Sequence, residues 1–219
     1  GRDVTSGRLL ECRKIMLEWT EFQRCCREIE ALSINLNDGW HFVVQQDEPG
    51  CSYLEKRSVI KAQSRHPKDV PSDDYHAADF GLKEELDCES VVEDNQEALR
   101  CVYNIVYSVS YSVPVLYFNI WKQDGSLLPL PEVWSMVPDS FQGQLKDVWW
   151  STITQQEHPI LGTPFFQLHP CKTAQLMDQL LPSQNKEHAN YIVTWLSSMA
   201  PLVGLDLPNG YSALTAARQ

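Results

Sequence analysis

One cysteine of the sequence lies in a setting that favours chemistry. Cys171 follows His169 and Pro170 at the end of an apolar, strand-like stretch, and a helical pattern begins directly after it. The first N–H groups of a helix have no partner within the helix and favour nearby negative charge, so a thiol there loses its proton more easily. Lys172 adds positive charge. Because the thiolate is the reactive form, Cys171 is the predicted nucleophile, with a packed, inert thiol as the alternative.

The other six cysteines have weaker settings. Three lie on or beside apolar stripes and are predicted core residues: Cys25, Cys26 and Cys101. Three more have no chemical neighbourhood: Cys12, Cys51 and Cys88. The odd total and the lack of any C-x-x-C or H-x-x-x-H pair predict reduced thiols, without a bound metal or cofactor. The sequence also contains neither a G-x-S-x-G elbow nor a glycine-rich phosphate loop.

Composition narrows the function further. The 219 residues fit one domain, residues 1–219, and 22 aromatic residues argue against a disordered chain. A net charge of −11 disfavours binding to nucleic acid. The longest apolar run, residues 113–120, is too short to span a membrane, and the first eight residues are polar. We therefore expect a cytoplasmic protein without an integral membrane segment.

Hydrophobic periodicity predicts the elements that must position Cys171. A stripe at three- and four-residue steps predicts a helix over 9–32, and a tight turn joins two strands at 40–46 and 52–61. Residues 63–98 are acidic, with little periodicity, and predict a flexible loop. Strands follow at 99–111, 113–122, 151–155 and 164–169, with a short helix at 131–137 and two helices after Cys171. The prediction is an α+β fold in which an N-terminal helix and C-terminal helices pack on an antiparallel meander sheet.

The two central strands carry apolar or aromatic side chains on both faces. One face is assigned Tyr103, Tyr107, Val115 and Tyr117. The other is assigned Leu116, Phe118 and Ile120. One face must cover the core helices, and the N-terminal helix and hairpin would cover the other. The alternative is that part of the second face, near Tyr117 and Asn119, holds a partner protein beside Cys171.

Two runs around the nucleophile carry a family resemblance. Residues 152–162 read TITQQEHPILG and lead to residues 165–173, FFQLHPCKT. These runs resemble the autophagy conjugating enzymes, whose active site is a His-Pro-Cys motif. Residues 107–118 resemble the sheet hairpin of this family, and residues 190–196 resemble its C-terminal helix. The resemblance covers residues 99–208, about half of the chain, and implies a ubiquitin-conjugating-like fold.

The family has two branches, and the resemblance distinguishes them. One branch conjugates a modifier to phosphatidylethanolamine and has a longer chain with a longer insert. The other conjugates autophagy-related protein 12 to a lysine of autophagy-related protein 5, and the short length and the QQEHPILG wording resemble this branch. The resemblance implies that the activating enzyme, autophagy-related protein 7, charges Cys171 with the modifier as a thioester, which the acceptor lysine then attacks.

One departure from ordinary ubiquitin-conjugating enzymes concerns the group that stabilises the oxyanion formed when the thioester is attacked. Those enzymes place a His-Pro-Asn motif several residues before the cysteine, whereas here His-Pro adjoins Cys171 and that Asn is missing. Backbone N–H groups after Cys171, or Asn119, are the candidate donors. His169 is expected to support the turn rather than act as a base, since Pro170 fixes its own φ. A non-catalytic binding module and a cysteine hydrolase are the competing functions; the hydrolase needs an oriented base, which the sequence does not supply.

Overall fold

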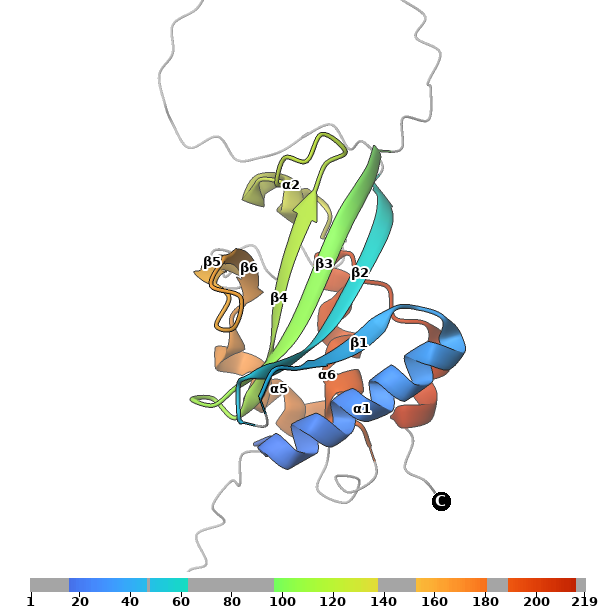
Figure 1. Cartoon of the computed structure of the whole chain (residues 1–219), viewed down its shortest axis with the longest axis vertical. Helices are drawn as coiled ribbons and strands as arrows, with labels where there is room; N and C mark the ends of the chain where they lie inside the picture. The colour runs from blue at the N-terminus through green and yellow to red at the C-terminus, as the bar shows by residue number, and fades with distance from the viewer. Residues whose placement is uncertain (1–15, 47, 63–96, 138–152, 181–188, 216–219) are drawn as a thin grey trace, which may run out of the picture.

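The computed structural model describes residues 16–46, 48–62, 97–137, 153–180 and 189–215. Within these ranges a helix precedes four strands, and a short helix, two more strands and the C-terminal helices follow (Figure 1). No helix in the described ranges is long and apolar enough to cross a bilayer. The elements are α1 Trp19–Leu36, β1 Trp40–Val44, β2 Ser52–Ala62, β3 Glu97–Ser108, β4 Val113–Trp121, α2 Leu130–Ser135, β5 Ile153–Glu157, β6 Pro164–Leu168, η1 Pro170–Lys172, α5 Thr173–Leu180, α6 Tyr191–Met199, η2 Ala200–Val203 and η3 Asn209–Leu214.

The strands form one antiparallel sheet with the order β1-β2-β3-β4-β6-β5. The first four strands are the predicted meander. The β5–β6 hairpin departs from it, because β6 pairs with β4 and leaves β5 at the edge. The predicted α+β fold of N-terminal helix, antiparallel sheet and C-terminal helices is confirmed. The predicted acidic loop at 63–98 lies outside the described residues, apart from its last two, which begin β3.

The core lies between the sheet and its helices. Phe22 and Ile29 of α1 and Trp195 of α6 are buried against Tyr103 and Phe118 of the central strands. Figure 1 shows α5 and α6 behind the sheet, with α1 crossing its lower end. We call the side of the sheet toward these helices the inner face and the opposite side the outer face.

The pairing of β3 with β4 decides which side chains share a face. Tyr103 lies opposite Phe118, and Val106 lies opposite Val115. Directly opposed residues point the same way, so the first pair belongs to the inner face and the second to the outer face. Because a one-residue change of register exchanges the faces of a strand, its periodicity alone does not assign them. The prediction of one shared face was therefore wrong for Tyr103, Tyr107, Val115 and Tyr117.

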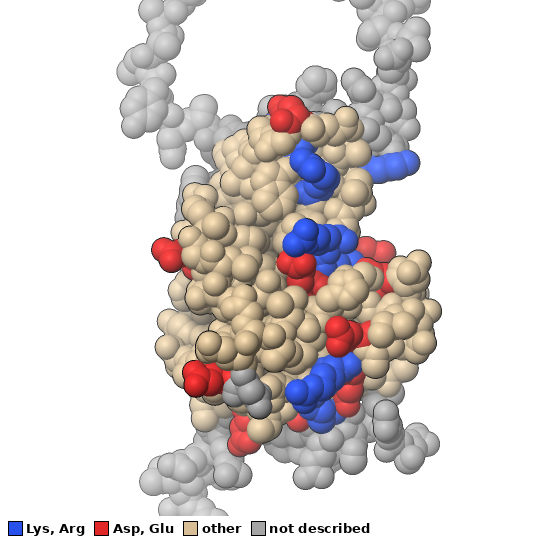
Figure 2. All heavy atoms as spheres, viewed as in Figure 1, with Lys and Arg blue, Asp and Glu red and all other residues tan. Residues whose placement is uncertain are grey.

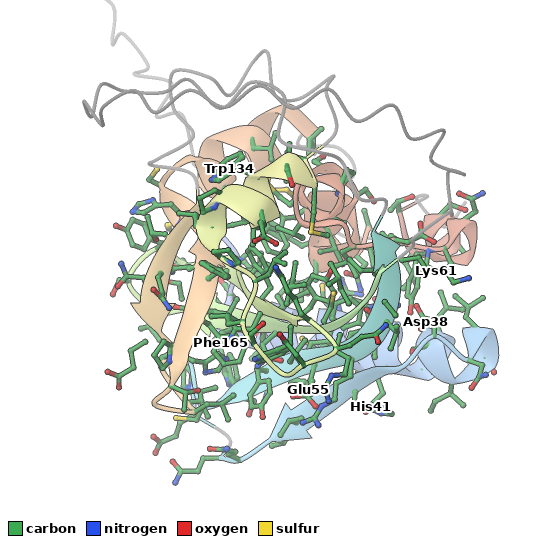
Figure 3. All side chains as sticks on the ribbon, turned by 90° about the horizontal axis from the view of Figure 1, so that it is seen from above. Asp38, His41, Glu55, Lys61, Trp134 and Phe165 are labelled. Carbon is green, nitrogen blue, oxygen red and sulfur yellow. The ribbon has the colours of Figure 1, made fainter. Side chains whose placement is uncertain are left out.

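The outer face carries a second, smaller apolar cluster. It consists of Tyr53, Val106, Val115, Tyr117 and Phe165, and half-buried Ile160 packs against it. Figure 3, seen from above, shows Phe165 and Glu55 on the side away from α6, and Trp134 on the helix side. The β5–β6 hairpin thus covers this part of the outer face, where α1 and the β1–β2 hairpin were expected.

The N-terminal helix begins later than its periodicity predicts. Residues 16–18 lie within the predicted helix but precede α1 without helical structure, and Glu18 is extended. The backbone N–H of Leu17 donates to Ser112 O at 2.8 Å, and the Tyr107 hydroxyl donates to Leu17 O at 2.9 Å. These bonds fix Leu17 against the β3–β4 turn and exclude it from the helix. At the other end, Asn37 adopts a left-handed conformation with φ 51° and ends α1.

Candidate active site

Cys171 lies where the sheet ends and the C-terminal helices begin. Strand β6 leads into η1, which starts with Pro170, and α5 follows directly. Proline suits the first position of a helix because its φ is already helical and its missing N–H has no partner there. The Cys171 side chain is exposed. The structure therefore has the predicted thiol at the start of a helical turn and open to solvent.

His169 supports this turn through its ring. Its Nδ1 accepts a hydrogen bond from the backbone N–H of Cys171 at 3.1 Å, so the lone pair of that nitrogen is already engaged. The exposed ring also contacts Tyr111 of the β3–β4 turn edge to face, with 6.4 Å between ring centroids. This arrangement fits the supporting role expected for His169 better than that of a base.

Hydrogen-bond donors near Cys171, the candidate oxyanion donors among them, already have partners. The N–H of Cys171 donates to His169, and the N–H of Thr173 donates to Pro170 O. Asn119 is 5% exposed, and its Nδ2 donates to Pro164 O at 2.9 Å, which ties β4 to the start of β6. This bond occupies one of the two N–H donors of the Asn119 amide.

Three of the described cysteines are poor nucleophiles because they are buried. Burial raises the pKa of Cys25 to about 12 and that of Cys101 to about 11, and it raises the pKa of Cys26 well above its ordinary value. Thiols with raised pKa stay protonated and react slowly. Cys51 is half-buried, and none of the described cysteines forms a disulfide. Cys12 and Cys88 lie outside the described residues.

A second histidine, in the turn between β5 and β6, is a buried anchor. His158 has no exposed surface and lies among the rings of Tyr53, Tyr117 and Phe165, with centroid distances of 5.5, 4.9 and 5.1 Å. It joins the β5–β6 turn to the outer face of the sheet. A His-Pro pair predicts the turn, but the burial follows from β2 and β4, which are distant in sequence.

Hydrogen-bond partners and burial define the environment of this anchor. Nδ1 of His158 accepts the backbone N–H groups of Ile160 and Leu161, both at 3.2 Å. Nε2 lies 3.3 Å from the side-chain amide of Asn104, a strand residue that is itself fully buried. Burial lowers the pKa of His158 to about 4. The ring is thus neutral at physiological pH and holds the hairpin that leads to Cys171.

Tyr117, predicted to contact a partner, lies beneath this anchor. It is 8% exposed, and its hydroxyl accepts a hydrogen bond from Nε2 of Gln167 at 3.2 Å. Its ring does not present an open surface, although Tyr117 lines a small pocket between the β3–β4 and β5–β6 turns. In the described ranges no group of His, Cys, Asp and Glu is arranged to hold a metal ion.

Comparison with known proteins identifies the family of this chain. A family model for the autophagocytosis associated protein, active-site domain, matches residues 21–210. The chain belongs to this family. The ubiquitin-like-conjugating enzyme ATG10 of Homo sapiens is 38% identical over 211 residues, which cover 89% of this chain and 92% of the relative. The ATG10 enzyme of Arabidopsis thaliana is 33% identical over 175 residues, 76% of each chain.

Membership of the autophagocytosis associated protein family confirms two predictions. The resemblance read from residues 99–208 is correct and extends into the N-terminal half, since the match begins within α1. The predicted class, a conjugating transferase, is also confirmed, because the chain matches most of the length of relatives that are named as conjugating enzymes.

Proposed function

We propose that this enzyme carries autophagy-related protein 12 as a thioester on Cys171 and transfers it to a lysine of autophagy-related protein 5. The activating enzyme, autophagy-related protein 7, supplies the charged modifier. The observation that carries the proposal is the exposed Cys171 at the start of η1, directly after His169 and Pro170. The printed names of the relatives support a ubiquitin-like modifier, and the wording of residues 155–162 supports this branch.

The chemistry consists of two acyl transfers. The Cys171 thiolate attacks the thioester carbonyl on the activating enzyme, a new C–S bond forms and the first thiolate leaves. The acceptor amine then attacks the carbonyl held on Cys171, which gives an isopeptide bond. The enzyme must mainly position the reactants. His169 and Pro170 fix the turn around Cys171, and Asn119 holds β6 through Pro164 O.

The kind of partner follows from charge. A net charge of −11 disfavours contact with nucleic acid and with anionic membrane surfaces, so the proposed partners are proteins. The free thiols of the described cysteines support the cytoplasm as the proposed location.

Cys171→Ser tests the proposal. Wild-type enzyme, incubated with activating enzyme, modifier and ATP, should form an adduct that thiol reductant removes. The serine variant should form an ester that resists reductant and transfers slowly. Cys51→Ser, at a half-buried cysteine, is the matched control and should behave as wild type. The absence of a reductant-sensitive adduct on the wild type would overturn the proposal and favour a non-catalytic binding module.

The acceptor is tested in the same system. Charged wild-type enzyme is divided between autophagy-related protein 5 and vesicles containing phosphatidylethanolamine. The proposal expects transfer to the protein. Transfer to the lipid alone would assign the chain to the lipid-conjugating branch, whereas release of free modifier without any conjugate would indicate a hydrolase.

A further inference from the structure

The chain just before α1 is bonded to the β3–β4 turn through both backbone groups of one residue. The N–H of Leu17 donates to Ser112 O at 2.8 Å, and the Tyr107 hydroxyl donates to Leu17 O at 2.9 Å. The Leu17 side chain is itself 1% exposed. Figure 1 shows the start of α1 and the β3–β4 turn at the same, lower end of the sheet. Leu17 therefore joins the N-terminal helix to this turn.

The turn has a backbone conformation that its neighbours must hold. Ser112 has a φ of 51°, in the left-handed region that residues with a side chain rarely adopt. Its N–H donates to Ser108 O at 2.8 Å, and its carbonyl oxygen accepts the bond from Leu17. Such a conformation persists only where the surroundings fix it. Leu17 is thus one of the residues that determine the shape of the turn.

The other side of the turn faces the nucleophile. The Tyr111 ring contacts the His169 ring edge to face, and Nδ1 of His169 accepts the N–H of Cys171 at 3.1 Å. Tyr111 and Pro170 also border the same small pocket, so the turn and η1 lie against each other. A continuous series of contacts therefore leads from Leu17 to the backbone of Cys171.

The turn contains no charged residue that could hold it in another way. Residues 109–112 read VSYS. Figure 2 shows the outer face of the sheet, with uncharged residues over β4 and with Lys and Arg gathered toward the right. Within the turn, hydrogen bonds and ring contacts must therefore do what ion pairs do elsewhere, and the loss of one buried hydrogen bond should be felt at its far end.

We propose that Tyr107 is a positioning residue for the transfer reaction. Its hydroxyl holds Leu17, and Leu17 holds the β3–β4 turn against the His169 ring. While that ring is held, Nδ1 stays bonded to the N–H of Cys171, and a thioester on this cysteine keeps one orientation toward the attacking amine. The inference depends on the proposed function, because the step that it assists is the attack on that thioester. Tyr107 acts through these residues and not on the reacting atoms.

A second buried tyrosine separates this role from a purely structural one. The rings of Trp19, Phe22 and Tyr107 lie 5.6 Å from one another, centroid to centroid, so Tyr107 also packs in the core. Tyr107→Phe keeps this ring and removes only the hydroxyl. Tyr103→Phe is the matched control, because the Tyr103 hydroxyl likewise donates to a backbone oxygen, that of Val203 at 3.0 Å, from the same strand. Both variants lose one buried hydrogen bond, but only the first loses a bond to Leu17.

The first readout is the backbone amide signal of Cys171 in an NMR spectrum of the uncharged, ¹⁵N-labelled enzyme. Tyr107→Phe should shift this signal, because the N–H of Cys171 bonds to the ring that the turn holds. Tyr103→Phe should leave it at the wild-type position. This measurement requires no modifier and no acceptor.

The second readout is the rate of transfer. Each enzyme is charged, the activating enzyme is stopped, and discharge is followed over a range of concentrations of autophagy-related protein 5. At saturating acceptor, Tyr107→Phe should discharge about fivefold more slowly than Tyr103→Phe, the factor that corresponds to one hydrogen bond. The acceptor concentration that gives half of the maximal rate should be equal in the two variants, because Tyr107 positions the thioester and does not bind the acceptor.

Tyr111→Leu tests the route. It removes the ring that contacts His169 at a position that is 50% exposed, where the fold tolerates a change. If Tyr107 acts through this ring, adding Tyr107→Phe to Tyr111→Leu should slow discharge by less than about twofold further, since two changes along one route are not additive.

The outcomes that overturn the inference are specific. It fails if either the Cys171 amide signal or the discharge rate of Tyr107→Phe equals that of Tyr103→Phe. It also fails if Tyr107→Phe still slows discharge about fivefold in the Tyr111→Leu background. A wild type that forms no thioester would instead remove the proposed function, while the amide signal would still report whether Tyr107 holds the backbone of Cys171.

Discussion

His158 makes a prediction about stability that can be worked from the structure. Its neutral ring is enclosed by three aromatic rings and the Asn104 amide, and Nδ1 accepts two backbone N–H groups. Protonation would place a third N–H against those two donors and a charge in an apolar site. We therefore expect that acid weakens the fold through this one side chain, and that His158→Asn removes the effect. Asparagine does not titrate, while its Oδ1 still accepts from the turn.

The magnitude follows from the two pKa values of the ring. Burial lowers the pKa of His158 to about 4 in the native state, against ~6.5 in the unfolded chain. Between these values the unfolded state binds a proton that the native state does not. This contribution to the free energy of unfolding is thus complete above pH 6.5 and is lost as pH falls toward 4. From pH 7 to pH 5 the loss is about 2 kcal/mol.

Urea unfolding at pH 7 and pH 5 measures this loss. His158→Asn should have a lower free energy of unfolding than wild type at pH 7, because the ring no longer fills its site. The difference between the two proteins should be about 2 kcal/mol smaller at pH 5. His41→Asn, at an exposed histidine of β1, is the control and should keep the wild-type dependence on pH. If the free energies of unfolding of wild type and His158→Asn differ by the same amount at pH 7 and pH 5, the reasoning is refuted.

Two further predictions concern buried groups. Lys56→Met should lower the free energy of unfolding by about 3–5 kcal/mol, since it leaves the Asp38 carboxylate, now 3.0 Å from Nζ, buried without its counter-ion. Arg57→Met breaks the exposed ion pair with Glu55 and should change the free energy of unfolding, measured by urea unfolding as above, by about 1 kcal/mol or less. Iodoacetamide should label Cys171 first and Cys25 only on unfolding, because one thiol is exposed and the other is buried with a raised pKa. Mass spectrometry that found Cys25 labelled first would contradict this.

Much of the fold was predictable because its signals are local. The turn after α1, the hairpin that follows and the long alternation of β3 and β4 appear close to their expected bounds. The errors arose where distant segments decide. Leu17 lies within the predicted helix, but bonds to Ser112 and Tyr107 keep it outside α1. Strand periodicity places side chains on alternating faces, but only the pairing of Tyr103 with Phe118 shows which face is the inner one.

The candidate site also has features that local sequence predicts and features that distant segments determine. A cysteine before a helix is a local pattern, and the exposed position of Cys171 agrees with it. Tyr117 and Asn119 were chosen as exposed residues of a strand face. Both are covered because the β5–β6 hairpin folds over that face, and no pattern within β4 contains that information. What is accessible near the nucleophile is consequently a pocket between turns rather than the surface of a strand.

The two His-Pro pairs show how far a local motif determines function. In both, Nδ1 of the histidine accepts the N–H of the residue two positions later, Ile160 for His158 and Cys171 for His169. The intervening proline has no N–H to compete and fixes its own φ, so the dipeptide builds the same small turn twice. The surroundings then separate them: aromatic rings from three strands or their ends enclose His158, whereas His169 stays exposed against Tyr111. The same turn therefore anchors a hairpin in one place and presents a nucleophile in the other, and the difference lies in what the sheet brings against each ring.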